Sequence, residues 1–220
     1  MRALWLLQNK TVDCEALAHE LDRMNHYARV DFIRGIPPSK HALLYEAVSH
    51  YKTLVPHDLV PENHPVYTPV EHTGMNNLFG VRHLGFAKVM YLDDQRRVCG
   101  RNVQALAWLT GDGYFTVEPS KEAPGYELDI SYLKLPTSVP NGWPKPQSNA
   151  RGFSYVVYRD MVDKLRAVSK HVTIGRAWKH GRALPHYFVL TRHDAALEVV
   201  WDVPSATPVT SAPKYARVAS

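Results

Sequence analysis

Long apolar runs are absent from this chain of 220 residues. No stretch approaches the roughly 18–20 consecutive apolar residues that a membrane-spanning helix needs, so the sequence does not predict an integral membrane protein. The apolar start, Met1 to Leu7, gives way to Gln8, Asn9 and Lys10 and is too short for the core of a secretion signal. We therefore expect a cytoplasmic protein with no membrane partner.

Cysteine is scarce, with Cys14 and Cys99 as the two examples. Two such distant residues make neither a CxxC pair nor a disulfide framework, and they exclude a zinc site built on thiolates. The chain also lacks a Gly-x-Ser-x-Gly turn and a His-Glu-x-x-His pair. Gly111 and Gly113 precede a strand pattern instead of a helix, which excludes a glycine-rich nucleotide-binding turn. The sequence predicts neither a metal nor a cofactor.

Concentrated charge is missing as well. The chain carries 26 Lys and Arg against 21 Asp and Glu, for a net charge of +5, and its longest basic run is Arg96-Arg97. Nucleic-acid binding is therefore not favoured, because such proteins usually cluster their basic residues on one face. Histidine is abundant, with 12 residues, but the prolines between His50, His57 and His64 prevent one helix from presenting all three. Ordinary polar histidines are favoured over metal ligands.

The first part of the chain has helical spacing. Asp13 can cap a helix over residues 13–25, and Ser39 can cap a second over residues 39–51. Between them, Val30 to Ile33 alternates weakly and is interpreted as a short strand.

The segment from Lys52 to Asn77 contains four prolines from Pro56 to Pro69, and neither a helix nor a central strand tolerates such spacing. We interpret it as a long ordered loop that folds over a cavity mouth and contributes His57 or His64 to a site. The alternative is a connector that lies on the surface with solvent-facing histidines.

From Leu78 onward the apolar residues recur with period two, and Gly or Asp turns separate the runs. No helical pattern lies between them, so the sheet should be antiparallel and curled, either a calycin-like barrel or an open cone. The fold class is α+β, mainly β, with residues 1–202 as one domain and 203–220 as a Pro/Ser/Thr-rich tail. The candidate strands are Leu78 to Leu84, Phe86 to Leu92, Arg97 to Leu109, Tyr114 to Glu118, Tyr126 to Leu135, Phe153 to Tyr158, Lys164 to Val168, Val172 to Trp178, Tyr187 to Thr191 and Leu197 to Trp201.

A family resemblance covers the 39 residues from Tyr155 to His193, in which Tyr158, Asp163, Arg166, Val168, Thr173, Gly175, Gly181, Tyr187 to Leu190 and Arg192 occur in order. This series resembles the last strands of calycin or lipocalin-like β-barrel proteins, the class named for a Gly-x-Trp-x-Gly motif. That motif is missing here, with only Phe32 and Gly35 near its place. The resemblance implies a barrel around an apolar cavity, and it implies no reaction.

Polar residues interrupt the aromatic strands, and about half of them would face the interior of a barrel. Ile174, Arg176 and Trp178 share one face of their strand, which fits an interior position or an arginine stacked on an exposed tryptophan. The interrupting residues are Arg82, His83, Lys88, Tyr91, Arg101, Tyr132, Tyr155, Tyr158, Arg166, His171, Arg176, Trp178, His186 and Tyr187.

Tyr, His and Arg among aromatic residues in a cavity predict a cofactor-independent enzyme of the isomerase, cyclase or lyase type, acting on a small hydrophobic or aromatic molecule. The predicted catalytic residues are His57, His64, Tyr158, Arg176 and His186, and the predicted substrate-binding residues are Tyr91, Tyr132, Tyr155 and Trp178. A noncatalytic carrier of a hydrophobic ligand and an interaction module with a basic surface stay open, as does a homodimer.

Overall fold

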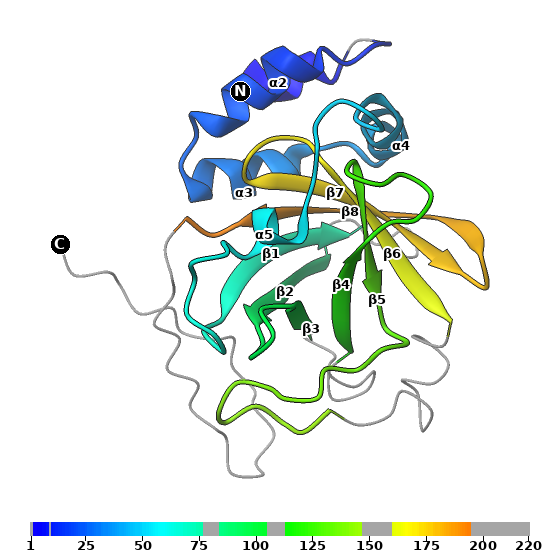
Figure 1. The fold of residues 1–220 in the computed structure, drawn as a ribbon. Coiled ribbons are helices and arrows are strands. Elements are labelled where there is room, and N and C mark those ends of the chain that lie inside the picture. The colour runs from blue at the N-terminus through cyan, green and yellow to red at the C-terminus, as the bar shows by residue number, and fades with distance from the viewer. Residues whose placement is uncertain (1, 9, 77–83, 105–112, 147–159, 195–220) are drawn as a thin grey trace, which may run out of the picture.

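Eight antiparallel strands form a closed barrel in the computed structural model, which describes residues 2–8, 10–76, 84–104, 113–146 and 160–194 (Figure 1). Each strand pairs with its neighbour in the chain, and β8 closes the circle by pairing with β1. The mainly β, antiparallel prediction is therefore confirmed, and the barrel is closed, so the open cone is wrong. The strands are β1 (Val70–Asn76), β2 (Leu84–Leu92), β3 (Val98–Gln104), β4 (Tyr114–Pro119), β5 (Glu127–Ser131), β6 (Met161–Ala167), β7 (Val172–Lys179) and β8 (Arg182–Arg192).

Seven of these eight strands overlap a predicted strand, and β1 is the exception because it lies in the segment interpreted as a loop. Pro69 directly precedes β1, so the prolines end where the strand begins. The predicted strands at 153–158 and 197–201, and 78–84 apart from Leu84, lie outside the described residues.

Alternate residues of seven strands, all but β7, contribute to one apolar cluster inside the barrel. Phenylalanine rings lie over glycines of neighbouring strands, and a Cβ added at Gly175 would stand 2.1 Å from Cζ of Phe188. Gly74 and Gly100 face Phe86 and Phe115 in the same way. The interior cluster comprises Leu54, Leu59, Val60, Val70, Met90, Leu92, Val98, Phe115, Val117, Leu128, Ile130, Tyr132, Leu165, Ala167, Phe188 and Leu190.

A layer of helices covers the outer face of β7, β8 and β1 (Figure 1). Asp13 accepts a hydrogen bond from Ala16 N, and Asn25 accepts one from Ala28 N, so each caps the helix that follows it. The predicted strand at Val30 to Ile33 is wrong, since these residues continue a capped helix that buries Val30 and Ile33 on one side. The helices are α1 (Arg2–Leu6), α2 (Cys14–Asp22), α3 (His26–Gly35), α4 (Pro38–Ala47) and α5 (Pro56–Leu59).

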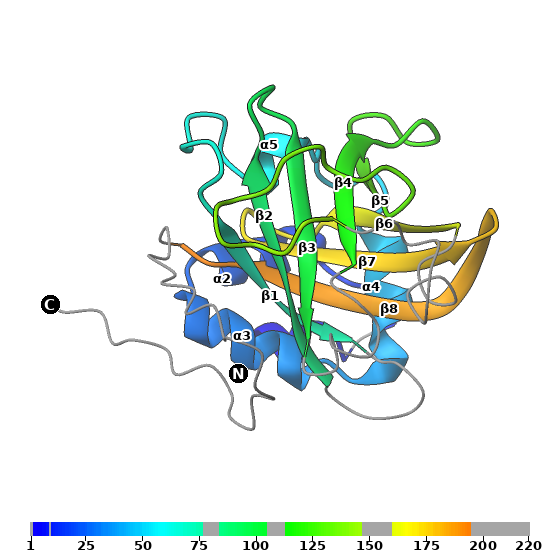
Figure 2. The same ribbon diagram turned by 90° about the horizontal axis from the view of Figure 1, so that it is seen from below.

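An irregular segment covers the outer face of β2, β3 and β4, as Figure 2 shows. Tyr91 donates a hydrogen bond to Ser138 O, and Tyr114 donates one to Pro144 O. Trp143 packs against both tyrosine rings, at 5.5 and 6.3 Å. The predicted irregular crossover at Pro136 to Asn149 contains no helix or strand in its described part, up to residue 146.

The proline-rich segment lies over one end of the barrel. Leu54, Leu59 and Val60 are buried in the interior cluster, and α5 contacts β3 and β4. This end, which we call the mouth, is also where the β6–β7 connection and the end of β8 lie. The segment therefore packs against the barrel as predicted, but its interpretation as a loop is wrong at α5 and at β1.

Candidate functional site

A pocket of about 230 Å³ opens at the mouth of the barrel, beside α5. Its walls come from the covering segment, the start of β1, the β6–β7 connection and the end of β8. Most of the lining side chains are polar, and five of them are Lys, Arg or His. The lining residues are Lys52, Thr53, Leu54, Asp58, Leu59, His72, Ala167, Ser169, Lys170, His171, Thr173 and Arg192.

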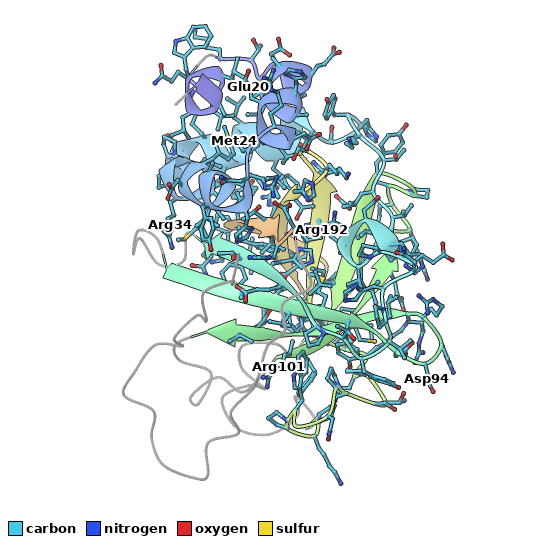
Figure 3. All side chains as sticks on the ribbon, turned by 90° about the vertical axis from the view of Figure 1, so that its left-hand side faces the viewer. Glu20, Met24, Arg34, Asp94, Arg101 and Arg192 are labelled. Carbon is cyan, nitrogen blue, oxygen red and sulfur yellow. The ribbon has the colours of Figure 1, made fainter. Side chains whose placement is uncertain are left out.

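Arg192 is the last residue of β8 and lines the pocket at the mouth, whereas Arg101 lies on the opposite side of the barrel (Figure 3). The Nη1 of Arg192 donates a hydrogen bond to Asp58 O at 2.5 Å, and the Nη2 of Arg192 lies 3.4 Å from Nδ1 of His171. Arg192 forms no ion pair with a carboxylate among the described residues. Burial lowers the pKa of this partly buried guanidinium, against the opposing charges of Asp58 and Asp194. The site therefore holds a cation that is not paired directly with a carboxylate of the described residues.

His171 stands beside Arg192 with its Nδ1 3.2 Å from Oδ1 of Asp194. Asp194 also pairs with the buried Arg29, whose Nη1 donates to Met24 O at 2.7 Å. Burial and the nearby charges of Arg29 and Arg192 lower the pKa of His171, against the opposing effect of Asp194. The imidazole is therefore neutral at physiological pH and able to accept a proton.

His72 forms part of the pocket floor and is fully buried. Its Nε2 lies 3.1 Å from Leu59 O, and because a carbonyl only accepts, the proton must be on Nε2. Burial lowers the pKa of His72 to about 3. On the facing wall, the Oγ1 of Thr173 is buried and has no hydrogen-bond partner among the described residues.

The rim of the pocket carries Lys52 and Lys170, both exposed and neither ion-paired within the described part of the chain. Asp58 is the acidic residue in the lining, but its Oδ2 accepts a hydrogen bond from Val55 N at 2.8 Å and so caps α5. The pocket is consequently rich in positive charge.

Next to the pocket, His26 at the start of α3 joins the helical layer to the barrel. Its Nδ1 lies 3.4 Å from Arg192 O, its Nε2 lies 3.4 Å from Oγ1 of Thr73, and its ring lies 4.2 Å from that of His193. Burial, followed by the charge of His193, lowers the pKa of His26 to about 4. Glu71 lies beside this group, and burial raises its pKa.

A second polar centre lies deeper in the barrel, beyond the pocket. Lys88 on β2 donates to Oδ2 of Asp163 at 3.0 Å, to the hydroxyl of Tyr132 at 2.6 Å and to Oδ1 of Asn102 at 2.9 Å. Phe86, Phe115, Tyr132 and Phe188 surround its ammonium group, with ring centres at 5.0–5.8 Å. All three donors of the ammonium are satisfied, which stabilises the charged form, although burial lowers the pKa of Lys88.

The predicted site residues that lie within the described part of the chain do not come together. Tyr132 points into the barrel, where it contacts Lys88. His57 and His64 lie in the covering segment but not in the pocket lining, and Nδ1 of His57 and Nε2 of His64 have no hydrogen-bond partner among the described residues. Burial lowers the pKa of His64. His186 lies on β8, nearer the β7–β8 turn than the mouth.

Tyr91, Arg176 and Trp178 lie on the outer face of the barrel. Arg176 and Trp178 share a face as predicted, but their neighbour Ala177 is the residue that pairs with the interior Asp163, so the interior interpretation of Arg176 is wrong. Arg176 instead donates to Leu184 O at 2.9 Å. The ring of Tyr91 packs under the 133–146 segment. Tyr155 and Tyr158 lie outside the described residues.

Several pocket residues were missing from the predicted site: His72, His171, Thr173 and Arg192. His171 was noted as a polar residue that interrupts an aromatic strand, but it was not predicted as a site residue. Its contact with Asp194, and the contact of Asp194 with Arg29, join segments far apart in the sequence, so no local sequence pattern indicates them. Strand parity could have found Arg192, because it shares a face with Phe188 and Leu190. His72 was hidden because β1 was interpreted as a loop.

No family model matches this chain, and no curated protein matches it in sequence. Its class rests on the fold and the site, which define a closed eight-stranded antiparallel barrel with a polar pocket at one mouth. Within the described ranges, no helix is long and apolar enough to cross a membrane, and no group of three or more His, Cys, Asp or Glu could hold a metal ion.

Proposed function

We propose that the protein binds a small molecule in the mouth pocket and catalyses proton transfer on it, with His171 as the acid–base group and without a cofactor. The observation that carries this proposal is the His171–Asp194 contact at the wall of the pocket. With its proton on Nδ1 donated to Asp194, the imidazole keeps the lone pair of Nε2 for a substrate proton. The carboxylate would then stabilise the imidazolium that forms.

The reaction types that suit this arrangement are isomerisation, cyclisation and elimination, in which one group removes a proton and can return it. The closed barrel and the entry of the ligand at one end support the further proposal that the chain is related to lipocalin-like barrels, in agreement with the resemblance of its last strands. The substrate would contact polar side chains at the mouth, because the interior beyond His72 is filled by buried side chains.

A noncatalytic carrier is the second candidate, and one observation favours it. Arg29 and Arg192 both lower the pKa of His171, which disfavours the imidazolium that proton transfer requires. A carrier would need the same pocket but no change of protonation. The interaction module with a basic surface stays a prediction, and its binding should weaken steeply as salt is raised.

The experiment that separates enzyme from carrier uses a panel of small molecules, detected by thermal shift and native mass spectrometry and then analysed for products. His171→Asn is the test variant, and His57→Ala, in the covering segment but outside the pocket lining, is its control. An enzyme predicts at least about a 100-fold loss of turnover in His171→Asn, since acid–base groups contribute about 10²–10⁴-fold. Ligands that bind without any product in the wild type would leave the carrier as the function.

A further inference from the structure

We propose that the ligand of the mouth pocket is an organic anion, whose carboxylate or phosphate group binds to Arg192, Lys170 and the hydroxyl of Thr173. This inference rests on the proposed function, because it names the chemical class that the same pocket takes. An anionic ligand differs from the hydrophobic ligand that the sequence predicts. The reason for the change is the positive charge of the side chains that line the pocket.

The first argument is the missing counter-ion of Arg192. Four other buried or partly buried cations have a carboxylate within 4.0 Å: Lys88 has Asp163, Lys164 has Asp129, Arg166 has Glu127 and, on α3, Arg29 has Asp194. Arg192 has none that close among the described residues: its Nη1 donates to the Asp58 carbonyl, and the carboxylates of Asp58 and Asp194 act on it through their charge without forming an ion pair. A desolvated guanidinium without an anion is costly, and a bound carboxylate or phosphate would remove that cost.

The second argument is the hydroxyl of Thr173. Thr173 is 6% exposed and lines the pocket, yet its Oγ1 makes no hydrogen bond to any described residue. Buried hydroxyls normally have a partner, so this one indicates an acceptor supplied from outside the chain. An anionic oxygen is a strong acceptor, and hydrogen bonds to it are charge-assisted.

The third argument is the arrangement of the remaining charges. Lys52 and Lys170 stand at the rim, where flexible ammonium groups can guide an anion inward. The carboxylate of Asp58 accepts a hydrogen bond from Val55 N and acts on Arg192 only through its charge, so no ion pair between Asp58 and Arg192 has to break when an anion binds. The anionic group would also lie near His171, where its negative charge favours the imidazolium and so offsets the two arginines.

The test compares benzoate with benzamide, which have nearly the same shape and differ in charge, and adds inorganic phosphate as a separate arm. Binding is measured by calorimetry and by NMR chemical-shift changes at constant ionic strength. We expect benzoate or phosphate to shift the signals of pocket residues and to bind at least about tenfold more tightly than benzamide. The arm that binds more tightly identifies a carboxylate or a phosphate as the natural group.

Thr173→Val and Lys170→Gln are the test variants, and Lys145→Gln, an exposed lysine in the 133–146 segment, is the matched control. Thr173→Val removes only a hydroxyl without a described partner, so the protein should stay folded while benzoate or phosphate affinity falls severalfold. Arg192→Gln should abolish binding, and the other two variants decide the matter if it fails to fold. Lys145→Gln should bind as the wild type does.

Two failures are distinguishable. If benzamide binds in the pocket as tightly as benzoate, and the variants change neither affinity, the anion inference is overturned while small-molecule binding stands. If neither these probes nor the compound panel shifts any pocket signal, the proposed function falls together with the inference.

Discussion

Lys88 on β2 and Asp163 on β6 form an ion pair across the interior of the barrel, with Nζ and Oδ2 3.0 Å apart and both side chains about 97% buried or more. The pair also holds Tyr132, whose hydroxyl donates to Asp163 Oδ2 at 3.0 Å. Burying two charges is expensive, and the attraction between them repays the cost only when both partners are present. The strands β2 and β6 and the residue that follows β5, Tyr132, are thereby held together by one set of polar contacts.

Replacing one partner of this pair should destabilise the barrel strongly. Lys88→Met leaves the Asp163 carboxylate buried without a cation, which costs about 3–5 kcal/mol of unfolding free energy. The double variant Lys88→Met/Asp163→Leu should recover most of the loss. Lys134→Met, which removes an exposed pair with Glu118, is the control and should cost no more than about 1 kcal/mol. Urea unfolding measures all three, and a Lys88→Met cost no larger than that of the control would contradict the role of the pair.

The barrel could be predicted because its signal is local. Period-two runs such as Phe86 to Leu92 predict the strands, and turn residues such as Gly113 between the runs predict that neighbouring strands are antiparallel. The strand β1 could not be predicted. The four prolines before it indicate a loop, and the alternation within β1, where Glu71 and Thr73 alternate with His72 and Gly74, is short. Closure of the barrel depends on β1 pairing with β8, which is a contact between distant segments and leaves no local pattern.

The site was harder to predict than the fold for the same reason. Parity says that Arg176 and Trp178 share a face, but not which face the helices cover. The outer face of β7 is apolar, with Val172 and Ile174 buried under α1–α4. The apolar Ile174 on the same face as Arg176 therefore does not show that this face points into the barrel. Arg29, His171 and Asp194 come from three separate elements, and only the folded chain brings them together.

Gly175 should not tolerate a side chain. The Cβ of Gly175→Ala would stand 2.1 Å from the ring of Phe188, which must then move within the packed interior. Overpacking of this kind costs about 1–3 kcal/mol. Gly85→Ala is the matched control, because its nearest atom is Met75 Cε at 3.8 Å. Thermal unfolding should show a clearly lower Tm for Gly175→Ala only, and adding Phe188→Leu should restore part of the loss; equal Tm values for both alanine variants would show that the ring has room to move.

Acid should destabilise the fold through His26 and His72. Burial lowers the pKa of His26 to about 4 and that of His72 to about 3, from 6.5 in the unfolded chain. Below pH 6.5 the unfolded chain binds these protons and the folded chain does not, so the unfolding free energy falls as pH drops toward 4 for His26 and 3 for His72. Each histidine adds a slope of about 1.4 kcal/mol per pH unit.

Urea unfolding between pH 7 and pH 4.5 measures this slope. His26→Asn keeps an N–H for the Arg192 carbonyl and should reduce the slope by about one histidine, whereas His19→Asn, an exposed position on α2, is the control. An unchanged slope in His26→Asn would mean that this histidine does not resist protonation in the folded protein.

The pKa of His171 should report the occupancy of the pocket. In the free protein the charges of Arg29 and Arg192 lower it, while Asp194 raises it. Removing one positive charge by Arg192→Gln should therefore raise the pKa of His171, and a bound anion near Arg192 should raise it in the same direction because negative charge favours the imidazolium. Asp194→Asn should lower it. An NMR titration of the histidine ring signals, with and without saturating benzoate or phosphate, measures each value. As the control, Lys145→Gln should leave the pKa of His171 unchanged. If an anion binds without raising the pKa of His171, its charged group lies away from this histidine, and the assignment of His171 as the acid–base group is contradicted.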